Sequence, residues 1–370
     1  MSRVRLSLFS TVLVSMMIVP FLPYANGAER SAKHADDTTD VAANLVWPQP
    51  PQRRRIAFMG QITGVDDVKG TRKRTWMDRA AGAKPKAPRT QLKTPYGVAT
   101  DSKGRIFVAD PSNRIVFVFD LEHRAVDYRG DHAPAQLALP MGVAIDDRDR
   151  LFVTDSFFHQ ITLFSPEGDV VAVFGANDLK RPGGIAVDSA AKRLYVADSK
   201  GNRVAVYHSE SLRLLGYIGS ADTPGEVEKG KFSCPTNVAI SRDGQVYVTD
   251  TWNSRVQVFD KQGQFVREFG QHGITPGSFV RPKGLALDVD GHVYVADSEF
   301  NNFQVLTSEG QTLLVVGSYG TSPGQFALIA GMAMDSNNRI YVTDQLRGRV
   351  QIFQYYPEAT TTASNQGPAK

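Results

Sequence analysis

Short apolar runs separated by polar turns recur along most of the chain. Six of these runs end in Val-Ala-Asp or Val-Thr-Asp, as in IFVAD, LFVTD and LYVAD, and their aspartates are 43 to 52 residues apart. A second apolar run precedes each of them, a third follows, and in most repeats a fourth comes after a further turn, as in QFVREFG. Each repeat therefore predicts four short β-strands. The repeat aspartates are Asp110, Asp155, Asp198, Asp250, Asp297 and Asp344.

The repeat length predicts the fold class. A four-stranded unit with a period in the forties is typical of a propeller blade, so six repeats predict an all-β, six-bladed β-propeller. The last repeat ends after its third run, whereas an unmatched apolar run, RIAFMGQI, lies ahead of the first repeat at residues 55–62. We expect this N-terminal strand to complete the last blade, because it would close the ring and remove an open sheet edge. The predicted propeller spans 55–357 and includes a basic crossover at 63–93.

The N-terminus has the order of a secretory signal peptide. Arg3 and Arg5 precede a long apolar run, and the small residues Gly27 and Ala28 follow it, so we expect a signal peptide at 1–28. The run is nearly long enough for an uncleaved membrane anchor, but two prolines near its end favour cleavage. The protein is therefore expected to be exported, either periplasmic or secreted, with an N-terminal anchor if the signal is retained. The polar segments 29–54 and 358–370 predict a disordered leader and tail.

Charge and cysteine content limit the possible partners. Residues 52–93 carry twelve basic and three acidic side chains, whereas 94–357 carry 25 basic and 30 acidic ones. A mildly acidic, exported body argues against nucleic acid as a partner. The basic segment is expected to be a solvated linker, with a phosphate or a membrane surface as the alternative. Because Cys234 is the only cysteine, an intramolecular disulfide is impossible.

The repeat motif resembles a known family. Four of the six units have Pro-x-Gly followed by an apolar-Ala run, all six then have the run ending in Val-Ala-Asp or Val-Thr-Asp, and the fourth has Asn-x-Arg before the third run, in NSRVQVF. This pattern is similar to the NHL repeat, and residues 94–355 resemble bacterial NHL-repeat six-bladed propeller proteins. The resemblance implies the fold. It does not imply one activity, because the family includes sensors, scaffolds, RNA binders and a metal-dependent lyase.

The repeat aspartates are expected to be structural. Each carboxylate follows the second strand, where it can accept backbone N–H bonds from the tight turn that comes next. In several repeats an arginine stands five residues later, as at Arg203, Arg255 and Arg349. We expect it to bond turn carbonyls or the aspartate of the neighbouring blade.

Departures from the repeat mark the candidate binding surface. The turns between strands two and three share one face with the connections between blades, and several of these turns carry aromatic or charged residues where small polar ones are expected. Such residues are typical of a recognition surface, although they could instead pack onto adjacent loops. The candidate face consists of Phe157, Phe158, His159, Lys200, Trp252, Phe300 and Arg347. The residues after the strand-one prolines are expected to ring the channel mouth, and they include Tyr96, Met141, Thr236 and Lys283.

The sequence shows no recognisable catalytic, cofactor or metal-binding set. The seven histidines do not converge in the predicted strand register, the strand-one runs contain no Glu, and the DVDG segment at 288–291 is better explained as a β-turn than as a calcium loop. The favoured hypothesis is a non-catalytic, exported binding propeller whose loop face takes a protein, a peptide or an envelope glycan. The alternative is a periplasmic, metal-dependent hydrolase or lyase with a divalent ion in the channel. The oligomeric state stays open.

Overall fold

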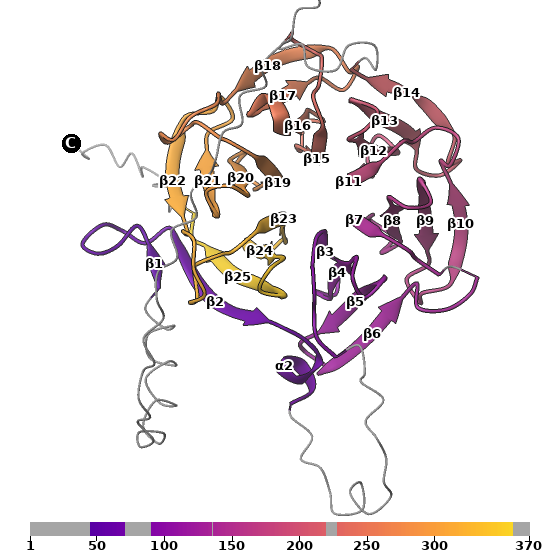
Figure 1. Ribbon diagram of the computed structural model, residues 1–370, viewed down its shortest axis with the longest axis horizontal. Helices are drawn as coiled ribbons and strands as arrows, with labels where there is room; N and C mark the ends of the chain where they lie inside the picture. Colours follow the sequence, from indigo (N-terminus) through magenta and orange to yellow (C-terminus); the bar gives the residue numbers. More distant parts are fainter. Residues whose placement is uncertain (1–44, 71–89, 135, 220–227, 358–370) are drawn as a thin grey trace, which may run out of the picture.

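Six antiparallel β-sheets surround a central axis (Figure 1). The computed structural model describes residues 45–70, 90–134, 136–219 and 228–357. The predicted signal peptide, most of the leader, and the tail lie outside these residues, and so does the middle of the crossover, 71–89. Within the described residues, no helix has the length and apolar character needed to span a membrane. The predicted six-bladed β-propeller is confirmed.

In blades one to five the strands run in chain order from the channel to the rim. Their bounds are as follows: blade one β3 (Val98–Thr100), β4 (Ile106–Asp110), β5 (Ile115–Asp120) and β6 (Ala125–Arg129); blade two β7 (Pro140–Ile145), β8 (Leu151–Asp155), β9 (Gln160–Phe164) and β10 (Val170–Phe174); blade three β11 (Pro182–Asp188), β12 (Arg193–Asp198), β13 (Arg203–His208) and β14 (Leu214–Ile218); blade four β15 (Pro235–Ile240), β16 (Val246–Asp250), β17 (Arg255–Phe259) and β18 (Phe265–Phe269); blade five β19 (Pro282–Leu287), β20 (Val293–Asp297), β21 (Asn302–Leu306) and β22 (Thr312–Val316).

Burial along the strands explains the apolar pattern of the sequence. The two middle strands of each blade lie between neighbouring blades, so nearly all their residues are buried, as in β4 and β5. The outermost strands alternate between half-buried and exposed positions, as in β10. Continuous apolar runs therefore mark the middle of a blade, and alternating runs mark its rim.

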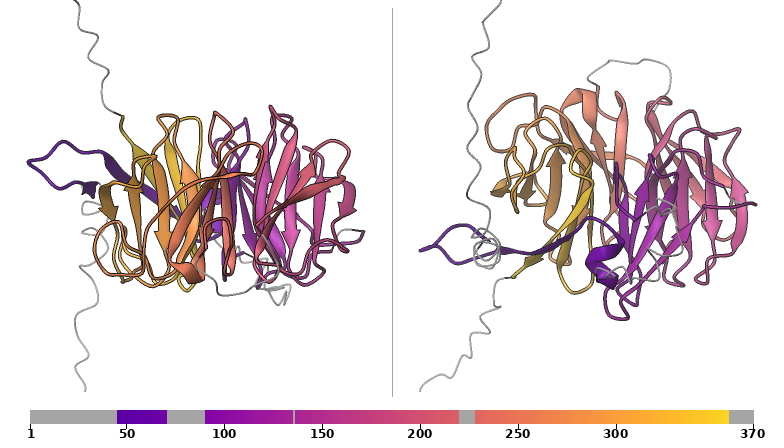
Figure 2. Two further views of the ribbon diagram at one scale, coloured as in Figure 1. Left: turned by 90° about the horizontal axis from the view of Figure 1, so that it is seen from above. Right: turned by 60° about the horizontal axis from the view of Figure 1, so that its bottom comes forward.

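The sixth blade closes the ring with strands from both ends of the chain. It contains β23 (Ile329–Met334), β24 (Arg339–Asp344) and β25 (Arg349–Tyr355), and the N-terminal β2 (Ile56–Ile62) pairs with β25 as its outer strand. The predicted closure is therefore confirmed. A further strand, β1 (Val46–Trp47), pairs with β2, so the leader predicted to be disordered at 29–54 contributes to this sheet. Figure 2 shows this N-terminal segment in indigo beside the orange and yellow C-terminal blades.

The reason why the leader joins the sheet is aromatic packing. The Trp47 ring lies edge-on to Phe353 with centroids 5.8 Å apart, and Phe58 lies 5.6 Å from the same ring. Phe353 is completely buried and also contacts Phe303 of blade five at 5.6 Å. These side chains join β1, β2, β25 and β21 in one cluster, which holds the seam of the ring together.

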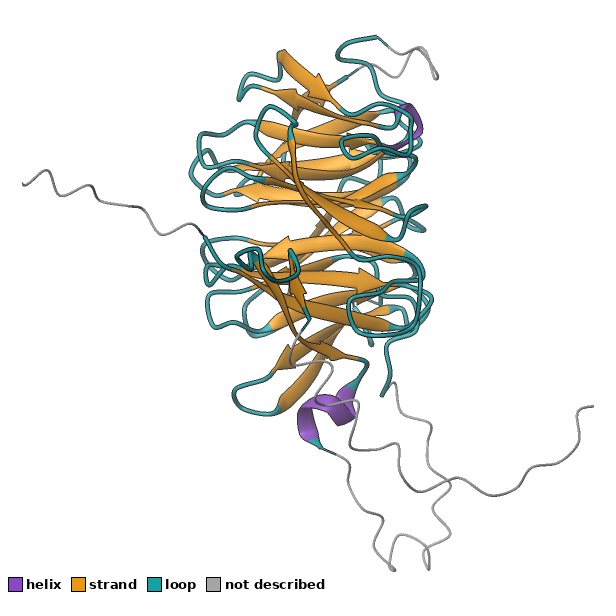
Figure 3. Ribbon diagram, turned by 90° about the vertical axis from the view of Figure 1, so that its left-hand side faces the viewer, coloured by secondary structure: helices purple, strands orange, loops and turns teal. Residues whose placement is uncertain are grey.

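The described ends of the crossover are fixed at the rim. Helix α2 (Val65–Lys69) follows β2, and its Val68 is buried against blade one. The Asp67 carboxylate accepts the backbone N–H groups of Thr63 and Gly64, which caps the start of this short helix. Figure 3 shows α2 in purple at the edge of the strand layers.

Threonine side chains join alternate pairs of blades near the channel. The residue before the repeat aspartate is Ala in blades one, three and five, and Thr in blades two, four and six. Each of these buried threonines donates its hydroxyl to a backbone carbonyl of the next blade, at the residue that follows the strand-one proline of that blade. The pairs are Thr154 to Gly183 at 2.6 Å, Thr249 to Lys283 at 2.9 Å and Thr343 to Tyr96 at 2.8 Å. Residues of the channel mouth are thus held from the neighbouring blade.

Candidate functional site

The repeat aspartates hold the loops of one face in place. All six carboxylates are completely buried. Asp297 accepts the backbone N–H groups of Glu299 and Phe300 from the turn that follows it, at 2.9 and 3.4 Å. It also accepts those of Val280 and Arg281, at 2.7 and 3.2 Å, from the connection that enters the same blade. One carboxylate therefore holds both loops of its blade. The sequence indicated only its bonds to the turn that follows.

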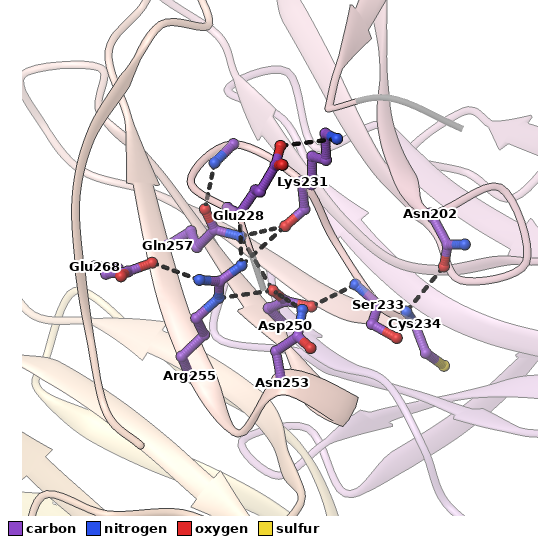
Figure 4. A network of polar contacts seen from close by, with 11 residues as sticks. Asn202, Glu228, Lys231, Ser233, Cys234, Asp250, Asn253, Arg255, Gln257 and Glu268 are labelled. Atoms are coloured by element: carbon purple, nitrogen blue, oxygen red, sulfur yellow. Dashed lines mark hydrogen bonds and ion pairs between the residues drawn. The ribbon is translucent and has the colours of Figure 1, made fainter. Parts of the chain in front are cut away.

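Blade four shows the fullest version of this arrangement (Figure 4). Asp250 accepts the backbone N–H of Ser233 at 2.7 Å with one oxygen. Its other oxygen accepts side-chain donors from Asn253, Arg255 and Gln257 at 2.8, 2.9 and 3.0 Å. Burial raises the pKa of the Asp250 carboxyl, and these bonds act against the increase. The network is internal: Asp250 is completely buried, and both of its carboxylate oxygens already accept hydrogen bonds from the protein.

The arginine of the repeat pairs with the aspartate of its own blade. The expectation that it could reach the neighbouring aspartate is wrong, because Arg255 stands directly opposite Asp250 in the β16–β17 pair. The Arg255 guanidinium also donates to the carbonyls of Glu228 and Lys231 and pairs with Glu268 at 2.6 Å. It therefore stabilises the connection that precedes β15.

The candidate loop face is largely exposed. Phe157, Phe158, His159, Lys200, Trp252 and Arg347 are exposed, and Phe300 is half-buried. The rings of Phe157 and Phe158 contact each other with centroids 5.1 Å apart. Trp252 lies in the short helix η1 (Thr251–Asn253). Its backbone N–H donates to the Ser233 carbonyl, and the Thr251 hydroxyl donates to the Pro282 carbonyl. The backbone of η1 is therefore held independently of the indole.

Two further apolar residues extend this face. Ile274 and Tyr319 lie in the connections that leave blades four and five, and the sequence analysis missed them. Among the large apolar side chains of the described residues, those more than 60% exposed all lie in loops of this face: Phe157 (65%), Trp252 (73%), Ile274 (85%), Tyr319 (69%) and Leu346 (68%). The signal in the sequence is an apolar residue inside the otherwise small and polar segments HGITPGS and SYGTSPGQ.

The central channel is a cavity of about 240 Å³ whose lining side chains, from the innermost strands, are mainly small or apolar. Among the described residues that line it, the polar side chains are Tyr96 and Asn237, and none is a histidine, cysteine or carboxylate. Asn237 takes the place that glycine holds in the other five blades, and a Cβ atom at Gly184 would collide with its amide. The sequence analysis missed this departure, which is visible as PTNVAI against the Pro-x-Gly pattern.

The predicted mouth residues lie at or just before the start of the innermost strands and are half-buried. Burial raises the pKa of Tyr96 to about 12. Burial lowers the pKa of Lys283, and the positive charge of Arg281 lowers it further. The Thr236 hydroxyl bonds that of Thr251 at 2.7 Å, which ties the mouth to the turn that carries Trp252.

One group among the described residues has metal-ligand character, and it lies on the opposite face. Asp288, Asp290 and His292 place one ligand atom each within 4.8 Å of the others. The Asp288 carboxylate, however, is occupied by His292 Nδ1 at 2.7 Å, the Tyr294 hydroxyl at 3.1 Å and two backbone N–H groups. The equivalent turn of blade one holds the same arrangement between Asp101 and Arg105, so this group is a structural turn of the repeat.

The Asp288–His292 pair makes stability depend on pH. The hydrogen bond to Asp288 raises the pKa of His292, so the pair stabilises the fold fully below the unfolded value of about 6.5 and loses this contribution as pH rises through the folded pKa. We expect His292→Gln to reduce the free energy of unfolding by less than about 1 kcal/mol, and by more at about pH 5.5 than at about pH 8.5. Urea unfolding at both pH values checks this.

The matched control is Arg105→Gln in blade one. Its guanidinium makes the same contact to Asp101 at 2.6 Å but keeps its charge throughout this pH range, so its effect should not change with pH. An equal pH dependence for the two variants would contradict the assignment to His292.

Comparison with known proteins identifies the repeat. The model of the NHL repeat matches residues 179–207, 232–259 and 279–306, which lie in blades three, four and five. The chain is 28% identical over 109 residues to a protein of Caenorhabditis elegans named probable peptidyl-alpha-hydroxyglycine alpha-amidating lyase pgal-1, covering 29% of this chain and 31% of the relative. It is 26% identical over 195 residues to human NHL repeat-containing protein 3, covering 48% and 55% of the two chains. The chain thus spans about a third and about half of these relatives.

Solved structures share the architecture at low sequence identity. A virginiamycin B lyase from Staphylococcus aureus with quinupristin has a TM-score of 0.54 at 14% identity, covering 72% of this chain and 97% of that chain. A gluconolactonase from Xanthomonas campestris has a TM-score of 0.55 at 16% identity, covering 72% and 87%. At these identities the likeness shows the fold alone. A bacterial origin stays a prediction, because the curated relatives named above are animal proteins. The chain is a six-bladed β-propeller, and its blades three to five match the NHL repeat.

Proposed function

We propose that this protein is a non-catalytic binding propeller that presents its loop face to a protein, a peptide or an envelope glycan. Export, which the N-terminal sequence predicts, places such a partner outside the cytoplasm. The binding mechanism is rigid display. The repeat aspartates hold the loops, and the loops carry the side chains that vary.

The observation that supports this proposal is the concentration of exposed apolar side chains on one face. Trp252, Ile274 and Tyr319 expose most of their surface, although they belong to turns whose backbone is tightly bonded. Exposing them is unfavourable in water and gives no packing in return. Large aromatic side chains on a rigid, partly charged surface are typical of protein recognition sites.

The alternative function, a metal-dependent hydrolase or lyase, has less support from the residues of the channel. Metal ions in such enzymes are held by converging histidines, cysteines or carboxylates. The described side chains that line the cavity offer Tyr96 and Asn237 as polar groups. The similarity to the amidating lyase covers 29% of this chain and 31% of that protein.

Trp252→Ala tests the proposal. We expect the variant to keep its melting temperature, because the η1 backbone is held without the indole, and to lose about 2 kcal/mol or more of binding free energy, roughly thirtyfold in Kd. The ligands are peptides selected from a phage-displayed library, or glycans from an array, that bind the wild type. Affinity is measured by isothermal titration calorimetry and stability by a thermal melt.

Leu215→Ala is the matched control. Leu215 is 54% exposed but lies on β14 at the outer rim, so its removal should leave binding unchanged. Equal affinity of Trp252→Ala and wild type for every selected ligand would refute the assignment of the loop face. A large fall in the melting temperature would make Trp252 a packing residue instead.

A further inference from the structure

Lys283 has an unusual position beside the channel. It follows Pro282 at the start of β19, and the Thr249 hydroxyl of blade four holds its carbonyl at 2.9 Å. Its backbone is therefore fixed by two blades, and its side chain is half-buried at the mouth. Arg281, two residues earlier, makes only a long contact of 3.7 Å to Glu299, and both of these side chains are more than half exposed.

The Lys283 ammonium lacks an anionic partner. Within the part of the chain that the structure describes, it forms no ion pair and no side-chain hydrogen bond. The repeat aspartates do not supply one, because they are completely buried within their blades, where their oxygens accept loop N–H groups. Burying a cation without a partner is unfavourable, and the lowered pKa of Lys283 reflects this cost. A ligand with negative charge would offset this cost.

The neighbouring polar groups are also hydrogen-bond donors without acceptors. The Asn237 amide oxygen accepts the Val238 N–H at 2.9 Å, so its NH₂ group is left toward the cavity that Asn237 lines. Arg181 directly precedes β11 on the same face, and its positive charge acts on the Tyr96 hydroxyl, so the two side chains lie near each other. The hydroxyl of Tyr96 and the guanidinium of Arg181 make no hydrogen bond in the described residues. The raised pKa of Tyr96 keeps its hydroxyl protonated. A carboxylate offers only acceptors, so it is the natural complement of this group of donors.

The surroundings favour a peptide as the source of the carboxylate. The exposed side chains of the loop face include the aliphatic Ile274 and Leu346 as well as the aromatic Phe157 and Trp252. Apolar side chains of a peptide pack on both kinds, whereas bases and sugars depend mainly on aromatic planes. A nucleic acid would also require a track of cations along its phosphates, and the body of this chain is mildly acidic.

We propose that the channel mouth is a carboxylate-binding subsite, in which Lys283, Arg181, Tyr96 and Asn237 take an Asp or Glu side chain of a peptide bound to the loop face. This inference rests on the proposed function and adds the charge of the partner. The subsite lies at the centre of the face, and the apolar side chains of the loops surround it.

The test measures binding of fluorescein-labelled poly-L-glutamate by fluorescence anisotropy. We expect Lys283→Met to weaken binding roughly tenfold or more, as for the loss of a charged hydrogen bond, and Lys283→Arg to retain most of it. Lys103→Met is the matched control, because it removes the same charge from an exposed turn of the opposite face. Its Kd should stay within about twofold of wild type, as expected for a distant surface charge at physiological salt. Poly-L-glutamine should not bind.

Several outcomes would overturn the inference. One is wild-type protein that does not bind poly-L-glutamate, and another is a Lys283→Met variant that binds as tightly as wild type. If polygalacturonate or polyuridylate bound as tightly as poly-L-glutamate and also required Lys283, the partner would be a glycan or a nucleic acid and not a peptide. Trp252→Ala separates this inference from the proposed function. If poly-L-glutamate binding requires Lys283 but not Trp252, the subsite stands and the wider loop face does not.

Discussion

Asp250→Asn is expected to lower the free energy of unfolding by about 3–5 kcal/mol, the range for breaking a buried ion pair. One Asp250 oxygen accepts three side-chain donors, and the other accepts the Ser233 N–H. The amide of an asparagine has a single oxygen, so it can accept from only one of these two sets of donors. Its NH₂ group would then face the N–H donors of the other set. Arg255, which is buried, would also lose one of its two carboxylate partners, and Glu268 alone would remain.

Urea unfolding followed by circular dichroism measures this effect. The control is Asp169→Asn, because Asp169 is exposed and makes no side-chain hydrogen bond within the described residues, so its removal should change stability by less than about 0.5 kcal/mol. If the two substitutions proved equally mild, the repeat aspartates would not be what holds the loop face, and the rigid-display mechanism would lose its basis.

Phe353→Ala is expected to destabilise the protein by about 3–5 kcal/mol, the usual cost of truncating a buried phenylalanine. Its ring lies 5.6 to 6.2 Å from those of Trp47, Phe58, Phe303 and Phe326. The cavity would therefore open where the N-terminal strands meet the last two blades. Because β1 and β2 belong to the segment that closes the ring, limited proteolysis should cut the variant first near these strands.

Phe157→Ala serves as the control for Phe353→Ala. It removes the same side chain from an exposed loop position and should leave the urea midpoint nearly unchanged. If Phe353→Ala lost stability without faster cleavage near residues 45–62, the aromatic cluster around Phe353 would stabilise the core in general and would not specifically hold the N-terminal strands in the last blade.

The sequence was sufficient for the architecture because a repeat states the same local pattern six times. The run at residues 55–62 could be placed in the last blade because RVQIFQYY has no fourth strand after it and an open edge is unfavourable. The strand β1 could not be predicted, because two residues carry no periodicity. It forms because the Trp47 side chain packs on Phe353.

The site was harder to predict because its parts are distant in the chain. The aspartates were assigned to the turn that follows them, but half of their hydrogen bonds go to residues 16 to 18 positions earlier, which only the folded blade brings near. Asn237 gives only a weak signal in the sequence, because a single Asn in place of Gly is a small change in a strand. Its importance depends on its position in a narrow channel, and the ring geometry alone reveals that.

The alternation of Ala and Thr before the repeat aspartates divides the propeller into three two-blade segments. Hydroxyl bonds join blades two to three, four to five, and six to one, and alanines occupy these positions at the other three boundaries. The donors of the mouth come from all three segments: Arg181 from the first, Asn237 and Lys283 from the second, and Tyr96 from the third. A carboxylate bound at the axis would therefore contact all three segments at once. It would add a connection between them at the centre of the ring, in addition to the closure that β2 provides at the rim of the last blade.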